Sequence, residues 1–156
     1  KSKRQLLGLL IESVSKGGNL LLNVGPTGRG NFDYRADKAL ASMGEWMKYH
    51  DKSIYGCTQA PEEFETPKHS LLTYNPETNR LYIHLMEYPL QNFRLPGYKD
   101  KIEYARFLHD GSELQFSAPT GHWHREELGE NDLNLILPVT KPNVEIPVIE
   151  LFLKKK

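Results

Sequence analysis

The chain has 156 residues, enough for one ordinary domain or two small ones that bury roughly two thirds of their unfolded surface. Its 20 basic and 20 acidic residues balance, so no net positive field attracts nucleic acid. A hydrophobic fraction of 38% excludes a disordered chain, and a single cysteine, Cys57, excludes an internal disulfide framework and reads as a packing residue. No apolar run approaches the ~18 residues of a membrane span.

The first fifty residues begin with a helical pattern. One face of a predicted first helix is formed by apolar residues at i, i+3, i+4 and i+7, namely Leu7, Leu10, Ile11 and Val14. Gly17 and Gly18 end this helix. Residues 19–24 then read as a short strand that is apolar on both faces, as in parallel sheets, and Gly25-Pro26 closes it.

A second helix follows the predicted strand. Asp33 is placed to cap it, and its apolar positions repeat at helical spacing, namely Ala36, Leu40, Met43 and Met47. Helix, buried strand and helix together indicate an α/β segment. A strand that is apolar on both faces needs neighbouring strands that fifty residues do not contain. We therefore expect this segment to be the cut edge of a larger α/β unit.

From about residue 53 the pattern changes to short alternating runs separated by Pro, Gly and Asn. Runs at 71–74 and 81–86, joined by the turn at 75–79, predict a hairpin. The further candidate strands lie at 104–108, 114–117, 133–137 and 148–153. Six or more closely spaced strands predict an antiparallel β-sandwich.

Two local motifs suggest ligands but fit them poorly. Gly25 and Gly30 have the spacing of a phosphate-binding loop, yet Asn31 and Phe32 stand where Lys and Ser/Thr are required. A nucleotide site is therefore disfavoured. A second motif places three metal-ligand types at alternating positions of one segment, His122, His124 and Glu126. They share one face of an extended backbone, but no fourth ligand is identifiable, so a metal site is disfavoured as well.

Other side chains suggest carbohydrate. Four aromatic residues could stack on sugar rings, namely Tyr88, Phe93, Tyr98 and Trp123. In a chain with 16 aromatics, packing at the rim or in the core is nevertheless the favoured interpretation. Asn23 lies at the carboxyl end of the single parallel-type strand, the end where barrel enzymes build their active sites. Its side chain is expected either to line such a site or, as the favoured reading, to tie the following loop in place.

Several segments resemble the retaining α-L-fucosidases of glycoside hydrolase family 29. The resemblance is carried by IESVSKGGNLLLNVGPT at 11–27, MGEWM at 43–47 and SIYG at 53–56, with weaker similarity at 81–85, 95–97 and 105–111. The family resemblance implies two parts. Residues 1–52 would be the end of a (β/α)8-like catalytic barrel, with its last strand and flanking helices, and residues 53–156 a C-terminal β-sandwich domain.

The resemblance also implies an activity and its limits. Family members hydrolyse terminal α-L-fucose from glycans by double displacement, which needs two carboxyl groups and no cofactor or metal. The nucleophilic Asp and the acid/base Glu belong to barrel segments expected upstream of this chain. No catalytic residue is therefore assigned here, the six histidines inherit no substrate role, and Asn23 is the only substrate-adjacent candidate. The isolated 156 residues are expected to be inactive.

One alternative remains open, a stand-alone β-sandwich module that binds carbohydrate or a protein. Such a module predicts saturable binding of fucosylated oligosaccharide at Tyr88, Tyr98 or Trp123. The partner implied by the family is a fucosylated glycan, reached through the missing part of the barrel, without nucleic acid or membrane. The resemblance leaves a homo-oligomer open, and family members are commonly secreted, periplasmic or lysosomal.

Overall fold

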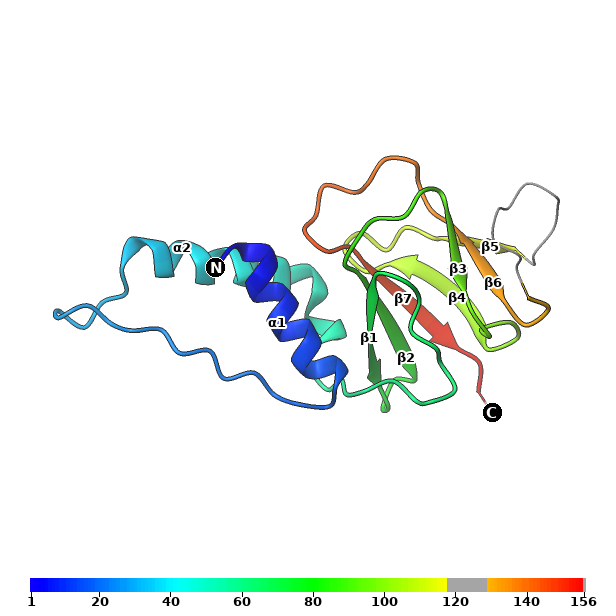
Figure 1. Ribbon diagram of the computed structural model, residues 1–156, viewed down its shortest axis with the longest axis horizontal. Coiled ribbons are helices and arrows are strands. Elements are labelled where there is room, and N and C mark those ends of the chain that lie inside the picture. The colour runs from blue at the N-terminus through cyan, green and yellow to red at the C-terminus, as the bar shows by residue number, and fades with distance from the viewer. Residues whose placement is uncertain (118–128, 156) are drawn as a thin grey trace.

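The computed structural model describes residues 1–117 and 129–155. Within them, two helices lie beside a sandwich of two antiparallel sheets (Figure 1). The helical part forms an arm that projects to one side, and the sandwich forms the other end of the molecule.

Helix α1 spans Lys3–Ser15 and follows the predicted pattern. The Ser2 hydroxyl accepts a hydrogen bond from the backbone N–H of Gln5, whose side chain accepts one from the N–H of Ser2, a reciprocal cap that satisfies two free donors. The left-handed backbone of Gly17 (φ 76°) terminates the helix, as the sequence predicts. The predicted apolar face is confirmed, because Leu7, Ile11 and Val14 are buried.

Helix α2 spans Tyr34–His50 and is followed by a single 3-10 turn, Asp51–Ser53. The predicted cap is confirmed, since the Asp33 carboxylate accepts a hydrogen bond of 2.9 Å from the N–H of Ala36. The predicted apolar residues of this helix are only half-buried. The side chains it buries instead are Trp46 and His50, in its last turns.

The sandwich confirms the predicted antiparallel architecture. The four-stranded sheet has the order β1 (Ser70–Asn75), β2 (Arg80–Leu85), β7 (Val148–Leu153), β4 (Ile102–Phe107). The three-stranded sheet has the order β3 (Asn92–Leu95), β6 (Leu133–Ile136), β5 (Gln115–Ser117). All predicted strands from residue 71 onward are present, and β3 is an additional strand.

The four-stranded sheet is buried on both faces. Leu81, Ile83 and Leu85 of β2 contribute to the core between the two sheets, which we call the sandwich core. The alternate residue Tyr82 packs on the other side against the helices, as expected for side chains that alternate along a strand. This second core, which we call the helix–sheet core, consists of Leu7, Ile11, Val14, Trp46, Ile54, Tyr82, Ile146 and Val148. The molecule therefore has three layers, helices, four-stranded sheet and three-stranded sheet.

The predicted buried strand at 19–24 is not formed. These residues are extended without strand pairing, and Leu21 is 85% exposed. The physical reason is that the described residues place no strand beside this segment to supply hydrogen bonds. Burial nevertheless alternates, since positions 20, 22 and 24 are half-buried and 19, 21 and 23 are exposed. The segment thus keeps a strand-like alternation with one face uncovered.

Candidate functional site

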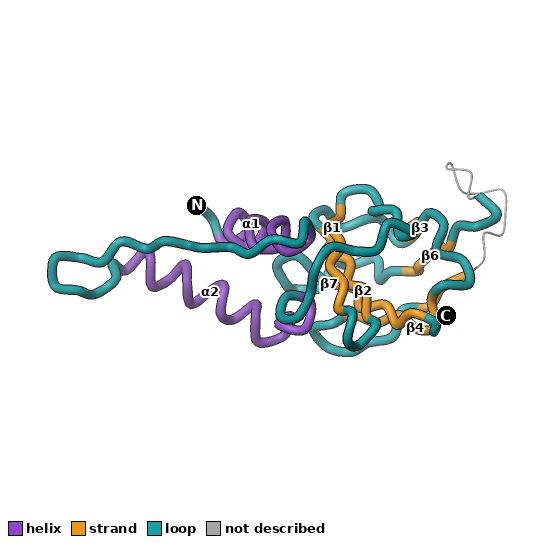
Figure 2. Tube along the Cα trace, turned by 90° about the horizontal axis from the view of Figure 1, so that it is seen from below, coloured by secondary structure: helices purple, strands orange, loops and turns teal. Residues whose placement is uncertain are grey.

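Asn23 lies on the long connection between the two helices. Residues 16–33 run beside α2 to a tip at the end of the molecule furthest from the sandwich (Figures 1 and 2). A tight turn forms this tip, where the N–H of Gly30 donates to the carbonyl of Thr27 at 2.9 Å and the N–H of Thr27 donates to that of Asn31. Asn23 is exposed, on the same uncovered face as Leu21. The predicted site residue is thus accessible, but no other candidate accompanies it.

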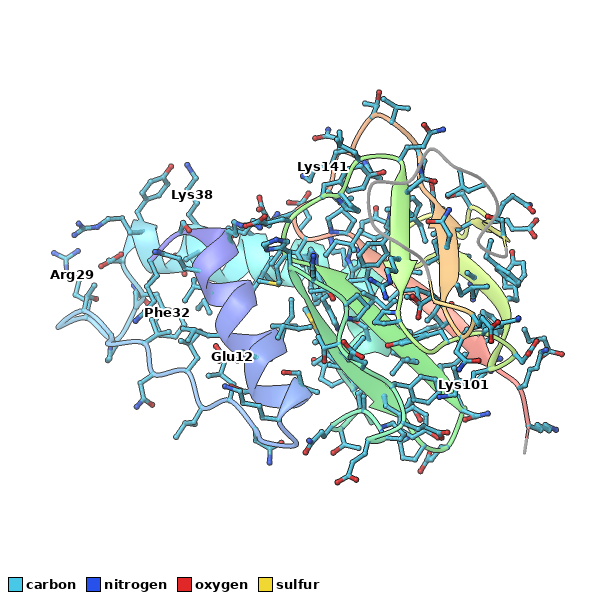
Figure 3. All side chains as sticks on the ribbon, turned by 45° about the vertical axis from the view of Figure 1, so that its right-hand side comes forward. Glu12, Arg29, Phe32, Lys38, Lys101 and Lys141 are labelled. Carbon is cyan, nitrogen blue, oxygen red and sulfur yellow. The ribbon has the colours of Figure 1, made fainter. Side chains whose placement is uncertain are left out.

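Large apolar side chains are exposed on and beside this connection. Leu21, Phe32 and Tyr34 are all exposed, and Figure 3 shows Arg29 and Phe32 on the outer part of the arm, away from the sandwich. Within residues 16–33 the only carboxylate is Asp33. Its pKa is lowered because it accepts the hydrogen bond from the N–H of Ala36. Since Asp33 serves as a helix cap, this connection can supply a wall or a support but not a pair of catalytic carboxylates.

The aromatic platform does not form at two of its four positions, where the favoured interpretation, packing in the core, is confirmed. Phe93 and Tyr98 are buried in the sandwich core, and the Tyr98 hydroxyl donates to the carbonyl of Glu65 at 2.8 Å. Tyr88 is half-buried, donates its hydroxyl to the carbonyl of Pro138 at 2.7 Å, and lines a hollow of about 520 Å³. Trp123 lies outside the described residues. Of the four platform residues, Phe93 and Tyr98 are therefore unavailable to a sugar ring, and Tyr88 is the described one that is partly exposed.

The possible metal-binding motif of His122, His124 and Glu126 lies outside the described residues. Across 1–117 and 129–155, no group of three or more His, Cys, Asp or Glu is arranged to hold a metal ion. No helix in those same ranges has the length and apolar character needed to cross a membrane. Cys57 is half-buried beside the helix–sheet core, and burial raises its pKa to about 11, which fits the predicted packing role.

Sequence reasoning missed a group of three histidines, of which His50 and His84 are buried and His109 is half-buried. His50, His84 and His109 come from α2, β2 and the turn after β4, and meet near Trp46. Their separation along the chain hides the grouping. The one local signal is that His84 interrupts the apolar run at 81–86.

Known proteins resemble both parts of the chain. The family model for α-L-fucosidase matches residues 1–52. A curated α-L-fucosidase of Branchiostoma floridae is 32% identical over 84 residues, covering 54% of this chain and 18% of that protein. One of Dictyostelium discoideum is 25% identical over 147 residues, covering 89% of this chain and 27% of that protein. The chain thus spans about a fifth to a quarter of these relatives' length.

Solved structures extend the similarity over the sandwich. α-L-Fucosidase isoenzyme 1 from Paenibacillus thiaminolyticus superimposes with a TM-score of 0.85 at 30% identity, covering 99% of this chain and 35% of that one. The Thermotoga maritima α-fucosidase gives a TM-score of 0.74 at 25% identity, covering 97% and 34%. The fold is therefore that of the C-terminal part of a glycoside hydrolase. More narrowly, the chain corresponds to the C-terminal part of the α-L-fucosidases.

Proposed function

We propose that this chain works as the C-terminal part of a retaining α-L-fucosidase that removes terminal α-L-fucose from glycans. It supplies the end of the catalytic barrel and the supporting sandwich, while the nucleophilic Asp and the acid/base Glu lie on upstream residues. The observation that carries the proposal is the superposition of 99% of this chain on the Paenibacillus thiaminolyticus α-L-fucosidase at 30% identity. Helices, connection and sandwich all take part in that match.

A retaining mechanism is supported by a more distant relative of the same fold. A family 29 α-L-fucosidase from Bacteroides thetaiotaomicron was trapped as a covalent intermediate with 2-fluoro-fucosyl fluoride. A covalent glycosyl-enzyme is the intermediate of double displacement, in which one carboxylate attacks the sugar and a second carboxyl group acts as acid and then as base. Our proposal extends this mechanism to the complete protein to which the present chain belongs.

In this proposal, residues 1–52 belong to the barrel and residues 53–156 to the sandwich. Residues 19–24 become a barrel strand, and their alternating burial supports this role. Leu21 and Asn23 share the uncovered face, which side chains across the interior of a barrel would cover, while the two adjacent strands would pair with the backbone of residues 19–24. Asn23 is then at the carboxyl end of the strand, as part of the wall of the substrate pocket.

Activity is tested on two proteins, the natural gene product purified from its source cells and the 156-residue chain. We expect the natural product to have a mass of roughly 40 kDa or more, as a barrel of ~250 residues plus a sandwich requires. It should hydrolyse 4-nitrophenyl α-L-fucoside and release the α-anomer of fucose first, as followed by NMR. The 156-residue chain should be inactive. A natural product of the size of this chain, or one without fucosidase activity, would refute the proposal.

The role of Asn23 is tested by Asn23→Ala in the complete enzyme. Loss of one neutral hydrogen bond to substrate or to the pocket wall should lower kcat/KM by about 3- to 10-fold. Asn19→Ala is the matched control, because Asn19 is exposed on the same face at the opposite end of the segment. We expect it to leave kcat/KM unchanged. Equal effects of the two substitutions would remove Asn23 from the pocket wall.

A further inference from the structure

Three histidines, two of them buried and one half-buried, meet where the end of α2 contacts the four-stranded sheet. His50 is the last residue of α2, His84 lies in β2, and His109 follows β4. The Trp46 ring stacks on His50 with a centroid distance of 4.3 Å and lies 6.4 Å from His84. The His50 and His109 rings are 6.3 Å apart. We call these three residues the histidine cluster.

The hydrogen bonds around two of these rings assign their protons. His50 Nδ1 lies 2.8 Å from the carbonyl of Trp46, an acceptor, so Nδ1 carries the hydrogen. The Thr73 hydroxyl donates to the carbonyl of Ser53 at 2.7 Å, so it can only accept from His84 Nε2 at 2.9 Å. Each ring therefore uses one N–H in a hydrogen bond, and its second nitrogen is an acceptor when the ring is neutral.

Those second nitrogens are buried without partners. Among the residues that the structure describes, His50 Nε2, His84 Nδ1 and His109 Nδ1 have no hydrogen-bond partner. A proton added to either of the first two would find no acceptor and would bring a charge into a site shielded from water. The contact therefore favours uncharged imidazoles at both positions.

The charged groups near the cluster do not offset the cost of protonating His50 or His84. Burial is the main cause that lowers the pKa of His50 to about 4, and His109 and Lys3 of α1 lower it further, while Asp51 of the 3-10 turn acts in the opposite direction. Burial also lowers the pKa of His84 to about 3, with His50 adding to the effect. His109 Nε2 faces the Asp110 carboxylate at 3.5 Å.

The contact that holds the cluster also holds α2 to the sandwich. The Trp46 indole Nε1 donates to the carbonyl of Glu145 at 2.7 Å. The next residue, Ile146, is fully buried and has a positive φ of 46°, a strained conformation for a β-branched side chain. Arg4 of α1 pairs with the Glu145 carboxylate at 3.1 Å. Separation of α2 from the sheet would relax Ile146 and expose both imidazoles to water.

We propose that the histidine cluster makes the contact between α2 and the four-stranded sheet acid-labile, so that acidification separates the helix from a sandwich that stays folded. The sandwich core supports this division, because its described residues include no histidine. Each imidazole that is kept neutral in the closed state and protonates freely in the open state raises the opening equilibrium constant about tenfold per pH unit below about 6.5. Two such groups give about 100-fold per unit.

The experiment follows Trp46 emission in the 156-residue chain from pH 8 to pH 4. Trp123→Phe leaves Trp46 as the only tryptophan, because the chain has two. Circular dichroism of the strands reports the sandwich in the same samples. We expect Trp46 emission to move to longer wavelengths below pH 6 while the strand signal persists, with the opening constant rising about 100-fold per pH unit.

Two substitutions remove the titrating groups while keeping their hydrogen bonds. His84→Gln can still donate to the Thr73 hydroxyl, and His50→Asn can still donate to the carbonyl of Trp46. In each single variant the opening constant should rise only about tenfold per pH unit, and in the double variant it should not depend on pH. The matched control is His69→Asn, because His69 is exposed, has a positive φ that Asn tolerates, and lies outside the cluster.

The pH slopes decide the proposal. The proposal is supported if opening takes up about two protons in the wild-type chain, one in each single variant and none in the double variant, while His69→Asn behaves like the wild-type chain. If the double variant opens with the wild-type slope, the cluster is not the sensor. If Trp46 emission and the strand signal change together at every pH, acid unfolds the whole chain and the helix-release proposal is wrong. The wild-type titration alone gives this last result, even if a variant fails to fold.

Discussion

Trp46 joins α2 to the sandwich by both packing and hydrogen bonding. Its ring is buried in the helix–sheet core and stacks on His50, and its indole N–H reaches the carbonyl of Glu145 across 99 positions of sequence. Because Ile146 next to this carbonyl is strained, the hydrogen bond also helps to fix an unfavourable backbone conformation.

Trp46→Phe should lower the free energy of unfolding by about 2 kcal/mol, because Phe fills less of the core and the carbonyl of Glu145 loses its donor. Urea denaturation at pH 7.5 measures this. Tyr49→Phe is the control, since Tyr49 is exposed on the same helix and its change should stay within about 0.5 kcal/mol. A Trp46→Phe protein as stable as this control would show that the contact does not hold the helix.

Residue roles could be predicted from the sequence only where the signal is local. The Asp33 cap and the stop at Gly17 are set by neighbours within four residues, and both are confirmed. Exposure of Phe93 and Tyr98 could not be read locally, because their burial depends on the packing of one sheet on the other. The histidine cluster was missed for the same reason, as its members are brought together only by the fold.

At the scale of elements, the connection between α1 and α2 behaves as a strand without its sheet. Burial alternates along residues 19–24 as it does in a strand. The segment nevertheless has no strand pairing, and Leu21 is exposed. The environment of Leu21 should therefore depend on which polypeptide contains it.

Leu21→Asp is expected to have opposite outcomes in the two proteins. In the 156-residue chain it should change the free energy of unfolding by less than about 0.5 kcal/mol, because Leu21 is exposed there. In the complete enzyme it should prevent soluble folding, since a buried, unpaired carboxylate is not tolerated. Leu7→Ala is the control, because Leu7 is buried within this chain and should cost about 2–5 kcal/mol. A soluble, active Leu21→Asp enzyme would contradict the barrel-strand proposal.

Prediction of elements from sequence worked where periodicity was strong. Both helices and six strands were identified from their patterns. Strand β3 was missed because it has only four residues and is followed directly by Pro96, which reads as a loop signal. The strand at 19–24 was predicted from its composition, yet strand formation depends on neighbouring strands, and residues 1–117 and 129–155 place none beside it.

At the scale of the whole molecule, the helix–sheet core crosses the proposed boundary between 1–52 and 53–156. Leu7, Ile11 and Trp46 lie on one side of that boundary, and Tyr82 and Val148 lie on the other. The four-stranded sheet therefore depends on the preceding helices to cover its outer face. The hydrophobic pattern of the sequence nevertheless changes from helical to strand-like at this boundary.

Removal of residues 1–52 should consequently destabilise the sandwich. The shortened chain would expose Tyr82, Ile146 and Val148, which are buried in the complete one, at a cost on the order of 5 kcal/mol. At pH 7.5, where the helix contact is closed, we expect the 53–156 chain to melt at least 10 °C lower or to aggregate, as measured by calorimetry, with the complete chain unfolding in one transition. Adding Tyr82→Thr and Val148→Thr to the shortened chain should restore solubility by removing the exposed apolar surface. If 53–156 without these changes were as stable as the complete chain, the sandwich would be an independent domain and the helices merely attached to it.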